Sequence, residues 1–138
     1  MGREGVLVDA GPLVALLSAR DQHHQRCVDA AKSLRGPFYT CWPAVTEAAY
    51  LLRDQPSAVL RLLNRIRAGK LRLLDVGAND IEGIGQILER FADQRLDLAD
   101  AILMHLAQRE DLQHAFTVDR RHFSLFRLSD GRPLVVIP

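Results

Sequence analysis

The sequence contains little cysteine and no long apolar run. Its two cysteines, Cys27 and Cys41, form no CxxC pair and have no histidine at zinc-finger spacing, so we expect reduced, structural thiols. The apolar runs are interrupted well before membrane-spanning length, and the N-terminus lacks a basic segment followed by an apolar one. These features predict a cytoplasmic protein with no membrane partner.

The chain also lacks an excess of charge of either sign. It has 18 basic and 17 acidic residues among 138, so net charge alone predicts no nucleic-acid partner. Hydrophobic residues make up 48%, which is ample for a core and excludes a disordered chain. Because the length fits one domain and no linker or repeat interrupts it, we expect residues 1–138 to form a single domain.

A continuous apolar run near the N-terminus organises the rest of the chain. Residues 5–8 (GVLV) precede Asp9, after which Gly11 and Pro12 introduce a helical apolar pattern over residues 12–19. The run is typical of a strand buried on both faces in the middle of a parallel sheet. Asp9 should therefore lie at the carboxyl end of a central strand, either as a helix cap or as the floor of an active site.

Strand-like and helical patterns then alternate along the chain. Further strands are predicted at residues 38–41, 71–76 (near an edge), 114–118 and 134–137. Further helices are predicted at residues 23–35, 43–52, 56–68, 79–93 (with Asn79 as its cap) and 97–107. This order predicts the α/β class: a three-layer α/β/α sandwich around a central, mostly parallel sheet.

Four acids are expected to meet at one edge of that sheet. Asp9 and Asp119 directly follow strand patterns, whereas Glu47 and Asp100 lie in the first turns of predicted helices. The carboxyl ends of parallel strands and the beginnings of the following helices share one edge, so these carboxylates should converge there. The apolar neighbours of Glu47 and Asp100 predict that both are at least partly buried.

Each acid also has a purely structural interpretation. Asp97 and Asp100 suit a cap pair, and Asp119 suits a turn with Arg120 or Arg121. No lysine or arginine lies in either helix near Glu47 or Asp100 to neutralise them. A divalent cation is the economical partner for such a cluster.

The chain resembles the PIN-domain ribonucleases, and within them the toxins of VapBC-type toxin–antitoxin pairs. The resemblance spans almost the whole chain and rests on residues 6–9 (VLVD), 11–17 (GPLVALL), 43–47 (PAVTE), 96–101 (LDLADA) and 116–123 (FTVDRRHF). It implies a PIN-like sandwich that binds Mg²⁺ or Mn²⁺ and cleaves single-stranded RNA. The family's acids map to Asp9, Glu47, Asp100 and Asp119, and its hydroxyl near the last acid to Thr117.

Among these residues, Asp9 and Asp100 are expected to bind the principal metal directly, because hard cations prefer carboxylate oxygens. Glu47 is expected to act through water or to orient the attacking water, and Asp119 to help hold a second ion. Thr117 would bond an acid or a phosphate; packing against the backbone is the alternative.

Two residues depart from the family pattern. Ala10 stands where many members have a hydroxyl beside the first acid, and His122 stands where a further acid often follows the last one. The second departure leaves the number of metals open, since a second ion would have fewer ligands.

Substrate contacts are less defined. Arg120 and Arg121 adjoin the last acid and either reach phosphate oxygens or form a solvated turn. Six basic residues between Arg53 and Arg72 suit a phosphate-tracking face or a solvated helix face. A packing role is expected for Trp42, and structural roles for His105 and His114.

The resemblance further implies a homodimer held inactive by a VapB-like antitoxin that lies in a groove. Residues 13–17 and the apolar face with Leu60, Leu63 and Ile66 would contribute to the groove or belong to the core. The main alternative function is a catalytically silent PIN-fold module that binds RNA or protein. A phosphatase is disfavoured because Gly11 occupies the position of the second acid, and a receiver domain because the chain lacks its paired acids and lysine.

Overall fold

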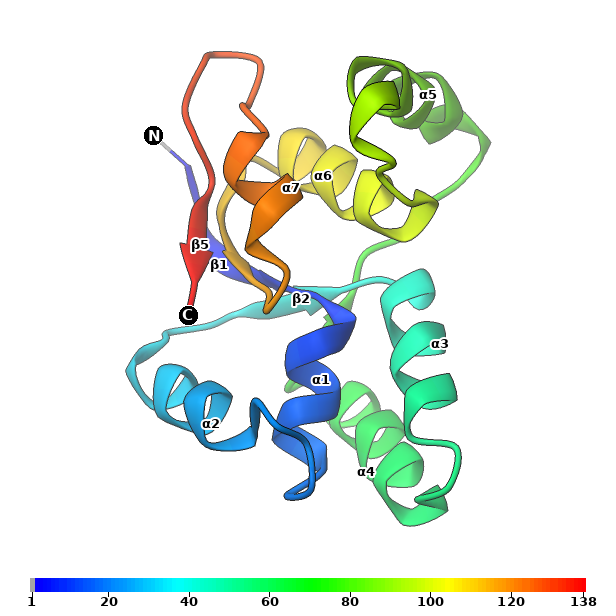
Figure 1. Ribbon diagram of the computed structural model, residues 1–138, viewed down its shortest axis with the longest axis vertical. Coiled ribbons are helices and arrows are strands. Elements are labelled where there is room, and N and C mark those ends of the chain that lie inside the picture. Colours follow the sequence, from blue (N-terminus) through cyan, green and yellow to red (C-terminus); the bar gives the residue numbers. More distant parts are fainter. Residues whose placement is uncertain (1) are drawn as a thin grey trace.

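The computed structural model describes residues 2–138, so Met1, the first residue of the expected domain, lies outside the described residues. Five parallel strands form one sheet in the order β3-β2-β1-β4-β5, which confirms the predicted parallel sheet (Figure 1). The strands are β1 (Arg3–Val8), β2 (Phe38–Thr40), β3 (Arg72–Leu73), β4 (Leu112–Phe116) and β5 (Val135–Ile137).

Helices cover both faces of this sheet, as the three-layer prediction requires (Figure 1). One face is covered by α1 (Ala10–Leu17), α2 (His24–Ser33) and α4 (Pro56–Arg67). The other face is covered by α5 (Ile81–Arg90), α6 (Leu98–Glu110) and α7 (Arg120–Leu125). The remaining helix, α3 (Trp42–Leu51), packs beside α1 and also contacts α6.

The central strand β1 is buried on both sides, as its apolar run predicts. Val6 and Val8 belong to the core beneath α1, α2 and α4, while Leu7 belongs to the core beneath α5, α6 and α7. This division follows from the two-residue period of a strand. Each of the three side chains is 3% exposed, and burial of such a side chain is worth about 1.5–3 kcal/mol.

Strand register brings the carboxyl ends of β1, β4 and β5 close together. Val8 pairs with Phe116, so the residues that follow β1 and β4 leave the sheet side by side. The Asp9 backbone N–H donates to the Phe116 carbonyl (2.9 Å), and the Thr117 N–H donates to the Ile137 carbonyl (2.8 Å). The carboxyl ends of β1, β4 and β5 are thereby joined at the edge where the first and last predicted acids lie.

Several helices begin at other residues than predicted. Helix α1 begins at Ala10, before Pro12, because the Asp9 carboxylate accepts the Ala10 N–H (2.7 Å). A short 3₁₀ turn, η1 (Ala78–Asp80), precedes α5, and the Gly77 N–H donates to Asp80 Oδ2 (2.8 Å). The predicted cap Asn79 is therefore wrong: it lies inside η1, and Asp80, which precedes α5, closes that turn and makes no side-chain bond to the start of α5.

Two strands and one helix also differ from the prediction. The strand expected over residues 71–76 shortens to Arg72–Leu73, at the edge where it was placed. Strand β4 ends at Phe116, two residues earlier than expected, which leaves Thr117 in the loop that precedes Asp119. Helix α7 was not predicted at all, and it carries His122 toward the acids.

Both cysteines are free and buried, as expected. Burial raises the pKa of Cys41 to about 11. Within residues 2–138, no helix has the length and apolar character that crossing a bilayer requires.

Gly11→Ala should destabilise the protein because α1 approaches the loop before Asp119 closely. A Cβ at residue 11 would lie 2.4 Å from Val118 Cγ2, and we expect the free energy of unfolding to fall by about 1–3 kcal/mol. Gly85→Ala is the matched control, since its Cβ would meet no atom within 4 Å and should add about 0.5–1 kcal/mol of helix stability. Urea unfolding of both variants measures the difference; equal effects would contradict the close approach.

Candidate active site

The end of β1 and the loop after β4 are joined by a buried hydroxyl. Thr117 is fully buried, and its Oγ1 donates to Asp9 Oδ2 (2.8 Å) while accepting the Asp119 N–H (3.1 Å). The other carboxylate oxygen of Asp9 accepts the Ala10 N–H. Asp9 thus caps α1 and also faces the acids, so its two interpretations are compatible.

The beginning of α6 supplies two more acids. Asp97 Oδ1 accepts the Asp100 N–H (2.8 Å), which is the cap arrangement expected for this pair. Asp97 is exposed, whereas Asp100 is 8% exposed. The cap occupies the backbone of Asp100, so its carboxylate remains available to the cluster.

Glu47 lies at the solvent-facing rim. The residue is exposed and so less buried than expected, although its carboxyl is partly desolvated. The buried face of α3 carries Ala44, Val45 and Ala48, and Glu47 lies beside that face. The cluster still affects Glu47: desolvation of its carboxyl, followed by the charges of Asp9 and Asp97, raises its pKa.

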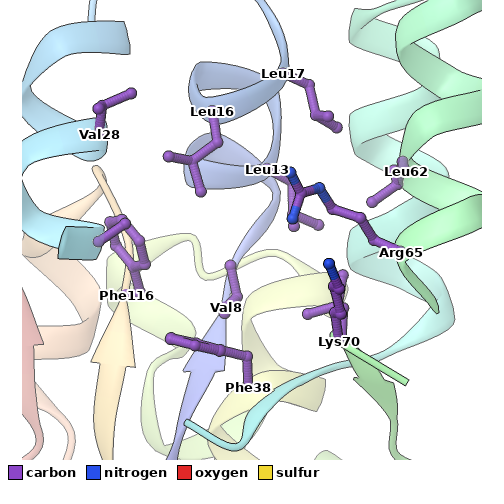
Figure 2. Close-up of a pocket in the computed structure, with 12 residues that line it drawn as sticks. Val8, Leu13, Leu16, Leu17, Val28, Phe38, Leu62, Arg65, Lys70 and Phe116 are labelled. Carbon is purple, nitrogen blue, oxygen red and sulfur yellow. The ribbon is translucent and has the colours of Figure 1, made fainter. Parts of the chain in front are cut away.

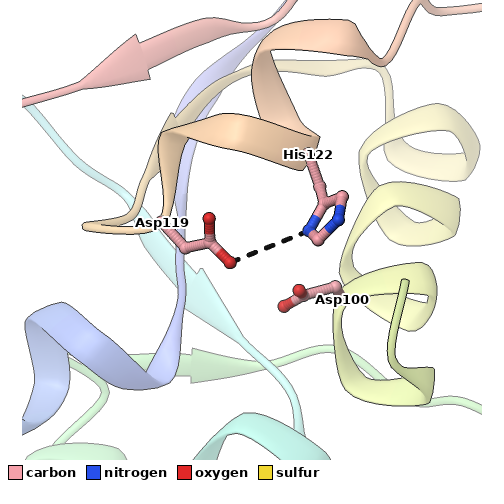
Figure 3. A group of neighbouring side chains, drawn as sticks. All are labelled: Asp100, Asp119 and His122. Atoms are coloured by element: carbon pink, nitrogen blue, oxygen red, sulfur yellow. Dashed lines mark ion pairs between the residues drawn. The ribbon is translucent and has the colours of Figure 1, made fainter. Parts of the chain in front are cut away.

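A histidine completes the arrangement. Figure 3 shows Asp100 from α6 and the side chains of Asp119 and His122, at the start of α7, directed toward one another. One ligand atom from each of these three residues lies within 4.8 Å of the other two. Asp119 Oδ1 also accepts the Arg121 N–H (3.3 Å), as the turn interpretation expected.

The electrostatics of the site are those of crowded, desolvated carboxylates. Burial, then the negative charges of Asp9, Asp97, Asp119 and Glu47, raises the pKa of Asp100 to about 8. Burial also raises the pKa of Asp9, with Asp97 and Asp119 adding to it against the hydrogen bonds from Thr117 and Ala10. Mutual repulsion of this kind is what a bound cation would relieve.

The residues present fit a divalent cation. The cluster offers carboxylate oxygens, the ligands preferred by Mg²⁺ and Mn²⁺. His122 adds a buried ring nitrogen, Nδ1, that has no hydrogen-bond partner. An orphaned buried acceptor beside repelling carboxylates indicates a site shaped for a positive ligand.

Arg120, next to the last acid, bonds to backbone carbonyls instead of the acids. The Arg120 guanidinium donates to the Val136 and Pro138 carbonyls, away from the carboxylates. Arg61, on the other face, donates to the Leu17 carbonyl (2.8 Å). A phosphate-binding role for Arg120 stays a prediction.

The predicted packing role of Trp42 and the structural roles of His105 and His114 have different outcomes. Trp42 is 58% exposed, so the expected packing role is wrong; its position at the start of α3 leaves the ring in solvent. His105 Nε2 bonds Asp80 Oδ1 (2.8 Å) at the α5–α6 interface, which agrees with a structural role. His114 is exposed.

Sequence reasoning underestimated one residue of the site, His122, which it treated as a lost acid. The signal that would have found it is a helix starting after the capping Asp119, because residue i+3 then returns toward the cap. The sequence left open whether Asp97 joins the site or only caps a helix. It is a cap, and its charge also raises the pKa of Asp9, Glu47 and Asp100.

Thr117→Val should weaken both the fold and the site. It leaves Asp9 Oδ2 without its donor and the Asp119 N–H without an acceptor, which should cost about 1–3 kcal/mol of unfolding free energy. Thr40→Val is the matched control: Thr40 is equally buried, but its hydroxyl donates to the Val8 carbonyl. We expect comparable destabilisation from both and reduced RNA cleavage only from Thr117→Val, in urea unfolding and cleavage assays; equal cleavage would contradict a positioning role.

Comparisons with known proteins agree with this geometry. The PIN domain family matches residues 6–127. The chain is similar to Ribonuclease VapC26 of Mycobacterium tuberculosis (strain ATCC 25618 / H37Rv), at 31% identity over 135 residues, covering 96% of this chain and 100% of that protein.

Solved structures share the fold at lower identity. The crystal structure of Mycobacterium tuberculosis VapC20, described as a Sarcin-Ricin loop cleaving toxin, has a TM-score of 0.75 and 21% identity, covering 84% of this chain and 91% of that one. The structure of VapBC2 from Rickettsia felis bound to promoter DNA has a TM-score of 0.64 and 12% identity, covering 95% and 96%.

The parallel sheet with acids gathered at its carboxyl edge defines a PIN-like α/β/α protein. With the family match and the VapC26 relative, the chain belongs to the PIN domain family.

Proposed function

We propose that residues 2–138 form a single nuclease domain that hydrolyses RNA with Mg²⁺ or Mn²⁺ and acts as the toxin of a VapBC-type pair. The observation that carries this proposal is the convergence of acids from four separate segments, with the pKa of Asp100 raised to about 8. The similarity to Ribonuclease VapC26 supports RNA as the substrate and ribonuclease as the activity.

The residues divide the chemistry between them. Asp9 and Asp100 are the buried carboxylates of the cluster and would hold the ion. Asp119, which lies in one group of possible ligands with Asp100 and His122, would complete the site. A bound divalent ion would neutralise phosphate charge and make water more acidic. Glu47, which is exposed, would orient the attacking water, and Thr117 would keep Asp9 in position through its hydrogen bond.

An apolar cavity supports an antitoxin partner. It has a volume of about 410 Å³ and lies between α1, α2 and α4, as Figure 2 shows. Leu13, Leu16 and Leu17 line it, as the groove hypothesis proposed for this helix. Leu62 lines it from α4, whereas Leu60 and Leu63 are exposed (61% and 41%).

We propose that this cavity receives an apolar segment of a VapB-like antitoxin. Arg65 and Lys70 also line the cavity and favour acidic residues in that segment. A homodimer and a cytoplasmic location complete the proposal, as expected for a toxin of this family that acts on cellular RNA.

The experiment is cleavage of a mixed RNA pool by purified, antitoxin-free protein in Mn²⁺, Mg²⁺ or EDTA. An Asp9→Asn preparation, purified in parallel, exposes contaminating nuclease. Cleavage that requires the metal and disappears in the variant supports the proposal. Identical behaviour of the two proteins, with no metal effect on melting, would favour the catalytically silent binding module instead.

A further inference from the structure

His122 is buried at the acid cluster, and only one of its two ring nitrogens has a hydrogen-bond partner. The residue is 5% exposed, and its side chain comes from the first turn of α7, next to the capping Asp119. Its Nε2 lies 2.8 Å from the backbone carbonyl of Gln94, in the 3₁₀ turn η2 (Ala92–Gln94). This bond fixes the orientation of the ring.

The same bond fixes the tautomer of the neutral ring. A carbonyl oxygen only accepts hydrogen bonds, so Nε2 must carry the proton and donate it to Gln94. In neutral imidazole the other nitrogen, Nδ1, then has a free lone pair. This is the state in which a histidine binds a metal, held by a hydrogen bond from its second nitrogen.

In the neutral ring, this lone pair is directed into the acid cluster. Nδ1 is buried and has no hydrogen-bond partner. It lies 3.8 Å from Asp119 Oδ2, which is too long for a hydrogen bond and is an ion pair only with a protonated ring (dashed line in Figure 3). Asp100 faces the same space. An unpaired buried acceptor is unfavourable, and a positive ligand between these groups would offset that cost.

We propose that His122 is a nitrogen ligand of the divalent ion, which it shares with Asp100 and Asp119. The inference rests on the proposed metal-dependent function and adds a residue to its ligand set. His122 therefore replaces the missing acid with a ligand of different chemistry. Imidazole favours Co²⁺ and other later transition ions over Mg²⁺, so this nitrogen should shift the preference of the site away from Mg²⁺.

The variant His122→Gln separates metal binding from structure. Its side-chain amide places a donor near the position of the histidine Nε2, so the bond to the Gln94 carbonyl is retained while Nδ1 is lost. His105→Gln is the matched control, because His105 bonds Asp80 and does not belong to the group of possible ligands around Asp100. Urea unfolding in EDTA verifies that both variants fold.

The deciding measurement is pulsed electron paramagnetic resonance of the Mn²⁺-loaded protein, which detects nitrogen bonded to the ion independently of activity. We expect ¹⁴N coupling in wild type and His105→Gln and its loss in His122→Gln. In calorimetry with Co²⁺ and Mg²⁺, His122→Gln should lose at least about tenfold in Co²⁺ affinity and clearly less in Mg²⁺ affinity.

Two other results distinguish a failure of this inference from a failure of the proposed function. If Mn²⁺ binds to wild type and Asp100→Asn abolishes binding, but no ¹⁴N coupling is seen, His122 is not a ligand and the proposed function stands. If wild type binds neither Mn²⁺ nor Co²⁺, the metal-dependent function fails, and the inference fails with it.

Discussion

Asp100→Asn should abolish RNA cleavage while making the metal-free protein more stable than wild type. Asp100 is buried, with its pKa raised to about 8 by burial and then by the charge of Asp9. The folded protein therefore holds this carboxyl against an electrostatic penalty that a neutral amide of the same shape does not incur. At neutral pH the gain in unfolding free energy should be a few kcal/mol.

The activity of Asp100→Asn should fall although its stability rises. Loss of a carboxylate ligand removes several kcal/mol of transition-state stabilisation, so the cleavage rate should drop by about a thousandfold or more. Glu89→Gln is the control, because Glu89 is exposed on α5 and is not among the charges that raise the pKa of Asp100. If Asp100→Asn unfolded the protein, or left cleavage intact, Asp100 would be a structural cap rather than a catalytic residue.

The second large effect is that divalent metal should stabilise the fold, and more strongly as pH rises. Without metal, the raised pKa of Asp100 means that the folded state binds more protons than the unfolded state between about pH 4 and about pH 8. The free energy of unfolding should therefore fall as pH rises through that window. Metal binding needs the deprotonated carboxylate, so its stabilising effect should grow over the same window.

Thermal melting measures this linkage. At a metal concentration about one hundred times the Kd, the stabilisation is about 2.7 kcal/mol, or about 5–10 °C for a chain of this size. The shift should be small near pH 5, large near pH 8 and absent in Asp100→Asn. A shift that does not depend on pH, or that persists in the variant, would indicate metal binding elsewhere.

The first and last acids of the cluster were predictable because strand order determines their place. An apolar run that ends in Asp9, and another that ends near Asp119, lead to the same edge whenever the strands are parallel. Exact strand ends mattered little, since Asp119 reached the edge although β4 ended early. Asp100 was predicted to be buried, correctly, from its apolar neighbours.

Other features depend on tertiary contacts that a local pattern does not contain. Helix α7 begins with Arg120, Arg121 and His122, which give no apolar helical period, so it was not predicted. The direction of the His122 ring is fixed by a carbonyl 28 residues earlier in the chain. Glu47 has apolar neighbours like those of Asp100, yet it is exposed because it lies beside the buried face of its helix rather than within it.

The most direct test of the account is to titrate Mn²⁺ into wild-type protein while both melting temperature and RNA cleavage rate are measured. If one ion at the acid cluster both relieves carboxylate repulsion and supports hydrolysis, the two curves should share a midpoint, and both responses should be missing in Asp100→Asn. Cleavage that persists in EDTA, or that saturates at Mn²⁺ concentrations that leave the melting temperature unchanged, would contradict the claim that these carboxylates form the catalytic metal site.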